Sequence, residues 1–261
     1  MSKRINLIPL AGAGQRFISA GYDSPKPLIS VSGLPMIVRA AGCLPRPDQW
    51  MFVCRKEHIV ESGIDSELKK HFQPAEIFSV NHLTEGQACT CMVARQSLDP
   101  DATLTIGACD NAMMYDRAQF ELEINSPNVD ALIWTFRNNP AVLQDPSMYG
   151  WVDADERGCV RRVSVKVPLS RKPMEDHAVI GAFTFKRARD FLASAEAMIQ
   201  ANRRIKNEFY VDEVINVAVE QGLCVKVFEV QHYICWGTPH DLLKYNHWHE
   251  WFSVIKSKTE N

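Results

Sequence analysis

The stretch "LIPLAGAGQRF" at residues 7–17 decides how the fold is interpreted. Its apolar first half is typical of a buried strand in a parallel sheet, and the glycines at 12 and 14 open a loop directly after that strand. Such a loop offers backbone N–H groups that can hold phosphate. Arg16 adds a guanidinium that can grip phosphate oxygens bidentately. The stretch therefore predicts an α/β fold with a phosphate-binding loop at a strand end.

A lysine follows in "PKPLI", residues 25–29. Its neighbours Pro25 and Pro27 restrict the backbone, so we expect the Lys26 ammonium to be presented at a fixed place. The plainer alternative is that Arg16 and Lys26 only decorate a surface loop. A dinucleotide-binding loop is disfavoured because Phe17 stands where that fingerprint needs glycine or alanine. In addition, Arg55 rather than an acidic residue ends the next strand.

Strand and helix patterns alternate through the first half of the chain. Strands are predicted at 5–12, 49–55, 76–80 and 102–111, with helices at 35–44, 58–72 and 85–98. This alternation predicts a doubly wound, mostly parallel sheet. Ligands bind beyond the carboxyl ends of such strands. The glycine loop and Asp110 should therefore face one crevice.

The second half is richer in strands, and we expect it to continue the same sheet. Strands are predicted at 129–137, 149–165 (with a turn at 155–158), 178–186, 224–230 and 231–236, and helices at 187–205 and 211–222. The tail carries Leu242, Tyr245, Trp248, Phe252 and Ile255 at steps of three and four, which predicts an amphipathic helix docked on the core or on a partner chain. We expect one domain over 1–261, with a nucleotide-binding half (1–125), a β-rich acceptor-binding half (126–240) and a C-terminal helix (241–261).

Composition narrows the function classes. Of 261 residues, 46% are hydrophobic and 23% charged, which is ordinary for a globular protein, and a net charge of −2 argues against a broad nucleic-acid surface. No apolar stretch approaches the roughly 18 residues of a membrane span. The apolar run near the N-terminus is too short for a signal peptide. The eight cysteines form no CxxC pair, so we expect reduced thiols in a cytoplasmic protein.

Together, "LAGAGQRF" (10–17) and "PKPLI" resemble the G-x-G-x-R and P-K-P-L signature of the sugar-nucleotide pyrophosphorylases. The resemblance extends over most of residues 5–243. The later segments that are similar to this family are "LTEGQACTCMVA" (83–94), "TIGACDN" (105–111), "YGWVDADERGCVRRVSVKVP" (149–168), "HAVIGAFTFK" (177–186), "NEFYVDEVIN" (207–216) and "WGTPHDL" (236–242). Capsule- and envelope-associated members look closest.

The resemblance implies a Rossmann-like nucleotidyltransferase fold. It also implies an Mg²⁺-dependent enzyme that transfers a nucleoside monophosphate from an NTP to a sugar 1-phosphate, or a similar phosphorylated small molecule, with release of pyrophosphate. Self-association through the C-terminal helix is a further expectation; nucleic acid and membrane insertion are not expected. The implied site residues are Arg16, Lys26 and Lys166 for catalysis; Leu10, Ala11, Gly12, Ala13, Gly14, Gly86 and Gln87 for the nucleotide; Asp110 and Asp212 for the metal; and Gly150, His177, Gly181 and Glu208 for the acceptor.

The sequence departs from the family pattern at two places. Cys235 stands where the late turn often supplies a second metal-binding carboxylate, and sulfur suits Mg²⁺ poorly. Either Asp212 or Asp241 replaces that carboxylate, or the ion keeps an extra water. Val165 stands where a glutamate usually touches the sugar, so either the acceptor is unusual or Glu208 makes that contact.

Two alternatives remain open at the level of sequence. One is a cytidylyltransferase for a phosphorylated alcohol or amine such as phosphocholine, because that branch shares the N-terminal signature. The other is a catalytically silent nucleotide-binding relative, which Cys235 and Val165 favour. The joint presence of Arg16, Lys26, Asp110 and Lys166 disfavours it.

Overall fold

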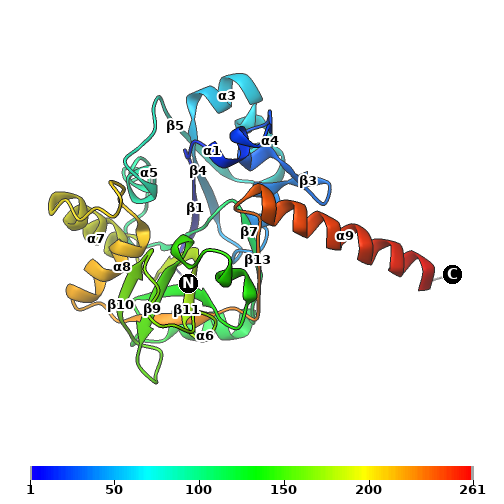
Figure 1. Cartoon of the computed structure of the whole chain (residues 1–261). Coiled ribbons are helices and arrows are strands. Elements are labelled where there is room, and N and C mark those ends of the chain that lie inside the picture. The colour runs from blue at the N-terminus through cyan, green and yellow to red at the C-terminus, as the bar shows by residue number, and fades with distance from the viewer. Residues whose placement is uncertain (1, 260–261) are drawn as a thin grey trace.

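The computed structural model describes residues 2–259, and a mixed nine-stranded sheet forms its centre (Figure 1). Seven strands follow the order β10-β9-β11-β6-β1-β4-β5, while β8 pairs with β11 and β12 with β8. The strands are β1 (Arg4–Leu10), β4 (Gln49–Arg55), β5 (Ala75–Val80), β6 (Thr103–Ile106), β8 (Ala131–Phe136), β9 (Gly150–Ala154), β10 (Val160–Val165), β11 (His177–Phe185) and β12 (Val225–Glu229). Both halves of the sequence thus contribute to one sheet, as predicted.

Strand β1 lies inside the parallel part of this sheet. It pairs in parallel with β4 on one side and β6 on the other. Ile5, Leu7 and Ile8 are fully buried because both faces of the strand are covered, which explains its unbroken apolar run. Since β1 and β6 run in the same direction, the glycine loop after β1 and the segment after Ile106 emerge at the same edge. The predicted doubly wound α/β fold is confirmed.

Antiparallel strand β11 joins the two halves. It pairs with β6 from the first half and with β8 and β9 from the second. A register irregularity between Val179 and Phe183 interrupts its pairing with β8. Through its pairing with β9, this strand connects the first-half strands to Gly150, which begins β9. Lys166 directly follows β10, the strand that pairs with β9.

Helices cover both faces of the sheet (Figure 1). They are α1 (Gln15–Ser19), α2 (Met36–Ala41), α3 (Lys56–Ser62), α4 (Ile64–His71), α5 (Gln87–Met92), α6 (Arg117–Asn125), α7 (Ala188–Gln200), α8 (Val211–Glu220) and α9 (Pro239–Thr259). The single helix predicted at 58–72 is wrong: Gly63, with φ +62°, ends α3 and begins α4. The helix predicted at 85–98 ends at Met92 and continues as turns.

Several short elements shape the edge where the strands end. They are the 3₁₀ turns η1 (Lys26–Leu28), η2 (Pro140–Leu143) and η3 (Pro146–Met148), and the strands β2 (Ser30–Val31), β3 (Leu34–Pro35), β7 (Asn111–Met114) and β13 (His232–Cys235). Strands β7 and β13 pair antiparallel, with Cys235 opposite Asn111. This pairing brings the late segment of the chain alongside Asp110.

Helix α9 begins on the body and then extends away from it (Figure 1). Leu242 is buried, and the Tyr245 hydroxyl lies 2.7 Å from the Ser32 hydroxyl. Docking on the core, the first of the two predicted alternatives, holds only for Leu242 and Tyr245, because Trp248, Phe252 and Ile255 remain 47%, 59% and 38% exposed. Docking on a partner chain stays a prediction. None of the described helices combines the length and apolar character needed to cross a bilayer.

The aromatic cluster around Trp134 should dominate the stability of the second half of the sheet. Trp134 is fully buried, donates its indole N–H to Thr184 over 3.0 Å and packs its ring against Phe120 and Phe228. Replacing it by alanine leaves a large cavity and removes one of the two hydrogen bonds of the Thr184 hydroxyl, which keeps its bond to Thr105. We expect Trp134→Ala to lower the free energy of unfolding in urea by about 3–5 kcal/mol. Leu122→Ala, at a position 69% exposed, should change it by less than about 0.5 kcal/mol; equal effects would contradict this assignment.

Candidate active site

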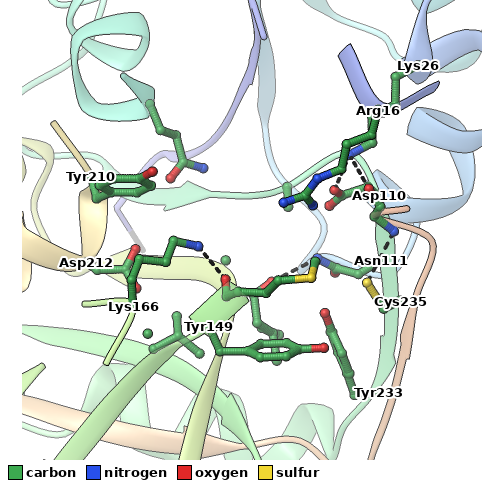
Figure 2. Close-up of a pocket in the computed structure, with 18 residues that line it drawn as sticks. Arg16, Lys26, Asp110, Asn111, Tyr149, Lys166, Tyr210, Asp212, Tyr233 and Cys235 are labelled. Atoms are coloured by element: carbon green, nitrogen blue, oxygen red, sulfur yellow. Dashed lines mark hydrogen bonds and ion pairs between the residues drawn. The ribbon is translucent and has the colours of Figure 1, made fainter. Parts of the chain in front are cut away.

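A cavity of about 250 Å³ lies at the edge of the sheet where β1 and β6 end (Figure 2). Among the residues that line it are eight predicted from sequence: Arg16, Lys26, Gln87, Asp110, Gly150, Lys166, Gly181 and Asp212. These residues come from segments spread over most of the chain, and the sheet topology brings them together. Arg16 and Asp110 thus line one cavity.

Lys26 and Asp110 form an ion pair inside this cavity. Lys26 begins η1, and its Nζ donates to Asp110 Oδ2 over 2.5 Å and to the Gly237 carbonyl over 3.3 Å. Burial disfavours the Lys26 charge, but the Asp110 carboxylate outweighs that effect, so the pKa of Lys26 lies above its ordinary value. The lysine is therefore a cation held at a defined place beside a carboxylate.

Arg16 enters the cavity from the first turn of α1. Gly14 precedes that helix with φ +64°, a left-handed conformation that glycine adopts without strain. A Cβ on Gly14 would lie 3.3 Å from the Lys26 Cβ, so the turn and the lysine segment pack closely. Figure 2 shows the Arg16 guanidinium on the same side of the cavity as Lys26 and Asp110. Two cations thus flank one carboxylate.

A second cavity, of about 330 Å³, adjoins the first through Gln87. Its lining includes Ala11, Gly12, Ala13, Gly86 and Glu208. The sequence placed Glu208 with the acceptor residues, but the structure places it here. Hydrogen bonds from the Phe209 N–H to the Glu85 carbonyl (2.8 Å) and from the Ala88 N–H to the Phe209 carbonyl (3.0 Å) bring the two segments side by side.

Gly86 permits this close approach. A Cβ at that position would lie 2.5 Å from the Phe209 nitrogen, and the glycine has φ +122°. Either observation alone would disfavour a larger residue. The start of α5, where Gln87 lies, is thereby fixed against Phe209, two residues before α8 begins.

Lys166, Asp212 and Gly150 lie together on another side of the first cavity (Figure 2). Lys166 has φ +64°, and its ammonium donates to the Met148 carbonyl and lies over the Tyr210 ring. Burial lowers the pKa of Lys166, and the nearby Asp212 carboxylate partly offsets this. A Cβ on Gly150 would lie 2.0 Å from Asp212 Oδ1, so only glycine leaves room for that carboxylate. Lys166 thus provides a further cation in the cavity, at a different place from Lys26 and Arg16, and the buried Asp212 carboxyl lies beside it.

The metal donors expected from sequence are not all brought together. Figure 2 shows Asp212 on the opposite side of the cavity from Asp110. Asp241 accepts hydrogen bonds from the Thr238 N–H and hydroxyl, at 3.2 and 2.6 Å, at the start of α9. Within residues 2–259, no group of three or more His, Cys, Asp or Glu side chains could hold a metal ion. Of the two metal carboxylates predicted from sequence, Asp110 lies on the side of the cavity that carries Lys26 and Asp212 lies on the side that carries Lys166.

Cys235 lies beside Asp110 as a thiol. Its Sγ accepts a hydrogen bond from the Gly237 N–H over 3.2 Å. Burial, reinforced by the Asp110 charge, raises the pKa of Cys235 to about 12. A protonated sulfur is a poor ligand for a hard cation. The donor set fits an Mg²⁺ bound through one protein carboxylate and completed by substrate phosphates and water, an arrangement that this ion accepts.

Three other predicted residues lie outside both cavities. Gly14 is in neither lining and packs against the Lys26 side chain instead. His177 Nδ1 lies 3.0 Å from the Thr135 hydroxyl, and its side chain is not part of either lining. Leu10 is buried in the core, so only its backbone could contribute to the loop.

The sequence reasoning also missed several residues of the first cavity. Those with polar side chains are Asn111, Tyr149, Tyr210 and Tyr233. Three of them directly adjoin a predicted site residue or share its segment, and that proximity was the available signal. Tyr233 had none, because only the pairing of β13 with β7 brings it here.

The fold is shared with solved nucleotidyltransferases. A nucleoside-diphosphate-sugar pyrophosphorylase from Vibrio cholerae RC9 matches with a TM-score of 0.72 and 18% identity over 92% of this chain and 98% of its own. An inositol-1-phosphate CTP transferase from T. maritima gives 0.71 and 14% over 94% and 95%. A putative glucose-1-phosphate thymidylyltransferase from Bacillus anthracis gives 0.73 and 18% over 94% of each chain. The chain therefore has the fold of these enzymes. No protein-family model and no curated protein sequence matches it.

The environment of Cys235 predicts slow alkylation. A rise in the thiol pKa from 9.0 to about 12 lowers the thiolate fraction near pH 8 by about 1,000-fold. The rate at Cys235, followed by peptide mass spectrometry with iodoacetamide, should therefore rise about tenfold per pH unit from pH 8 to pH 10. The urea-unfolded chain is the control and should level off near pH 9. A plateau below pH 10 in the folded protein would show an ordinary thiol that is merely shielded.

Proposed function

We propose that this protein is a nucleotidyltransferase that transfers a nucleoside monophosphate from an NTP to a phosphorylated small molecule and releases pyrophosphate. One observation carries the proposal: Arg16, Lys26, Asp110 and Lys166 line a single cavity. The glycine-loop cavity adjoins it through Gln87. The shared fold with solved nucleotidyltransferases supports the same conclusion. Four charged groups converging on one cavity also speak against a catalytically silent relative.

The proposed reaction makes one phosphorus–oxygen bond and breaks another. An oxygen of the acceptor's phosphate attacks the α-phosphorus of the NTP, and the bond from that phosphorus to the bridging oxygen of the β-phosphate breaks. Pyrophosphate leaves with the electron pair. Two anions must approach each other, and the leaving group gains charge, so positioning and charge neutralisation supply most of the catalysis.

The residues near the glycine loop suit the triphosphate. We assign the backbone N–H groups of residues 11–13 and the Arg16 guanidinium to the β- and γ-phosphate oxygens. Lys26 is placed to neutralise charge that develops between the α-phosphate and the leaving pyrophosphate. Asp110 would hold the Mg²⁺. When bound, that ion neutralises phosphate charge and fixes the geometry of the triphosphate.

The residues around Lys166 suit the acceptor. Its ammonium would bind the attacking phosphate, and its present bond to the Met148 carbonyl can be exchanged for a phosphate oxygen. Val165 is buried in the core and cannot make the contact of the glutamate usual in the family. Asp212 lines the cavity beside Lys166 and can accept hydrogen bonds from acceptor hydroxyls. We therefore assign Asp212 to the acceptor rather than to the metal, with a sugar 1-phosphate as the favoured acceptor.

The direct test is a substrate matrix. Each of the four common NTPs is incubated with Mg²⁺ and a panel of sugar 1-phosphates, inositol phosphates and phosphorylated alcohols or amines, and pyrophosphate release is followed with pyrophosphatase. Acceptor-dependent release with one dominant base is the expected result. NTP hydrolysis that ignores every acceptor, or no turnover at all, would overturn the proposal.

Lys26 should act mainly on the transition state. We expect Lys26→Ala to lower kcat at least about 100-fold, because one preorganised charge on a developing anion contributes a few kcal/mol. The KM for the NTP should change far less. Lys56→Ala, at an exposed lysine on α3, is the matched control and should be silent. An unchanged kcat with a raised KM would assign Lys26 to ground-state binding instead.

The two cavities should separate base choice from acceptor choice. Gln87 lines both cavities beside the glycine loop. An amide that is matched to the edge of one base is left with unpaired groups when another base binds. Gln87→Ala should therefore change the ranking of kcat/KM among the NTPs. Lys166→Ala should weaken use of the acceptor and leave the base ranking intact. The measurement is kcat/KM for each NTP and for the best acceptor in both variants. The reverse pattern would show that the two assignments are exchanged.

A further inference from the structure

The distal part of α9 carries an apolar surface that the body of the protein does not cover. Trp248, Trp251 and Phe252 are 47%, 50% and 59% exposed. Their ring contacts within the described chain are with one another and with His247. Leu243, Val254 and Ile255 are exposed on the same helix. Helices in proteins gain most of their stability from packing of an apolar face rather than from helix propensity.

A groove lies where α9 leaves the body. Ile234 of β13 forms one wall, and Tyr245, Trp248, His249 and Phe252 form the other. Its volume is about 400 Å³, and little of the lining is polar apart from Ser253 and Lys256. Ile234 is 44% exposed, and Met114, on the same face of the β7–β13 pair, is 64% exposed. The apolar surface therefore continues from the helix onto the body.

We propose that a second copy of this chain covers this surface, with two α9 helices packed antiparallel about a two-fold axis. Trp248 and Phe252 line the groove, and Trp251 lies beside them on the outer part of the helix. A two-fold axis brings this aromatic face of each helix against the same face of the partner, so one self-complementary interface covers it on both chains.

The apolar area of this surface matches the apolar area that a homodimer interface buries. Three half-exposed aromatic side chains offer on the order of 300 Å², and the exposed Ile234 and Met114 on the adjoining face of the β7–β13 pair bring the apolar total to roughly 500 Å² per chain. A homodimer interface of standard size buries about 800 Å² per partner, of which about 65% is apolar. The two apolar areas agree. The interface would lie along α9 and on the face of the β7–β13 pair that carries Ile234 and Met114. The opposite face, with Asn111 and Tyr233, lines the cavity that contains Lys26 and Asp110, so the inference does not depend on the proposed reaction.

Sedimentation velocity of the full-length protein over a wide concentration range tests this inference. We expect the wild type to be a dimer, and Trp248→Glu and Phe252→Glu each to be monomers with unchanged circular dichroism. Val60→Glu, which places the same charge at a position 75% exposed on α3, should remain a dimer. Persistence of the dimer in both α9 variants would overturn the assignment of the interface.

A second experiment tests whether the surface binds a lipid membrane instead of a second copy of the chain. The wild type is sedimented with vesicles of phosphatidylcholine and phosphatidylglycerol. A monomeric wild type that sediments with the vesicles, while Phe252→Glu does not, would show that the helix binds a lipid surface and would overturn the proposal. A wild type that is monomeric at every concentration, with or without vesicles, would also overturn it.

Discussion

The ion pair between Lys26 and Asp110 is the interaction around which the site is organised. It joins residues 84 positions apart in the sequence at a distance of 2.5 Å, and the Gly237 carbonyl adds a third segment. Two opposite charges that are mostly removed from water must be held in good geometry to offset their desolvation. The same two groups are those that the proposed chemistry needs, a cation for phosphate and a carboxylate for Mg²⁺. In the free protein each neutralises the other, so substrate binding exchanges one set of charge contacts for another.

Neighbouring segments hold this pair in place from both sides. The Trp236 N–H donates to the Asp110 carbonyl over 2.7 Å, and β13 pairs with β7 immediately beyond it. On the other side, Pro25 and Pro27 fix the turn of Lys26, and Gly14 packs against the lysine side chain. Neighbouring segments thus fix the positions of the two charged residues, Asp110 through a backbone hydrogen bond and Lys26 through the turn that carries it. This explains why a late strand of the chain, far from the glycine loop in sequence, belongs to the site.

The sequence predicted the fold and many of the site residues because their signals are local. The apolar run of β1 followed by Gly12 and Gly14, and the proline-flanked Lys26, depend on neighbouring residues alone. Glu208 and Asp212 show where such reasoning fails. They lie four residues apart around the start of α8, yet hydrogen bonds at Phe209 draw Glu208 to the glycine-loop side while Asp212 faces Lys166. Pairing between distant segments determines those positions, and no local pattern encodes it. Gly63 was a local signal for a break in the predicted helix, because glycine often ends helices. The apolar spacing continues past Gly63, however, and that spacing favoured one continuous helix.

The segment from Glu208 to Asp212 also links the two cavities physically. Glu208 borders the glycine-loop cavity, Tyr210 and Asp212 border the other, and Gly86 packs against the intervening Phe209. Since Phe209 is almost fully buried, the segment cannot shift at one end without moving the other. Filling one cavity should therefore restrain the residues that line the second. In a reaction that must bring two anions together, such a shared wall holds both substrates in register without any direct attraction between them.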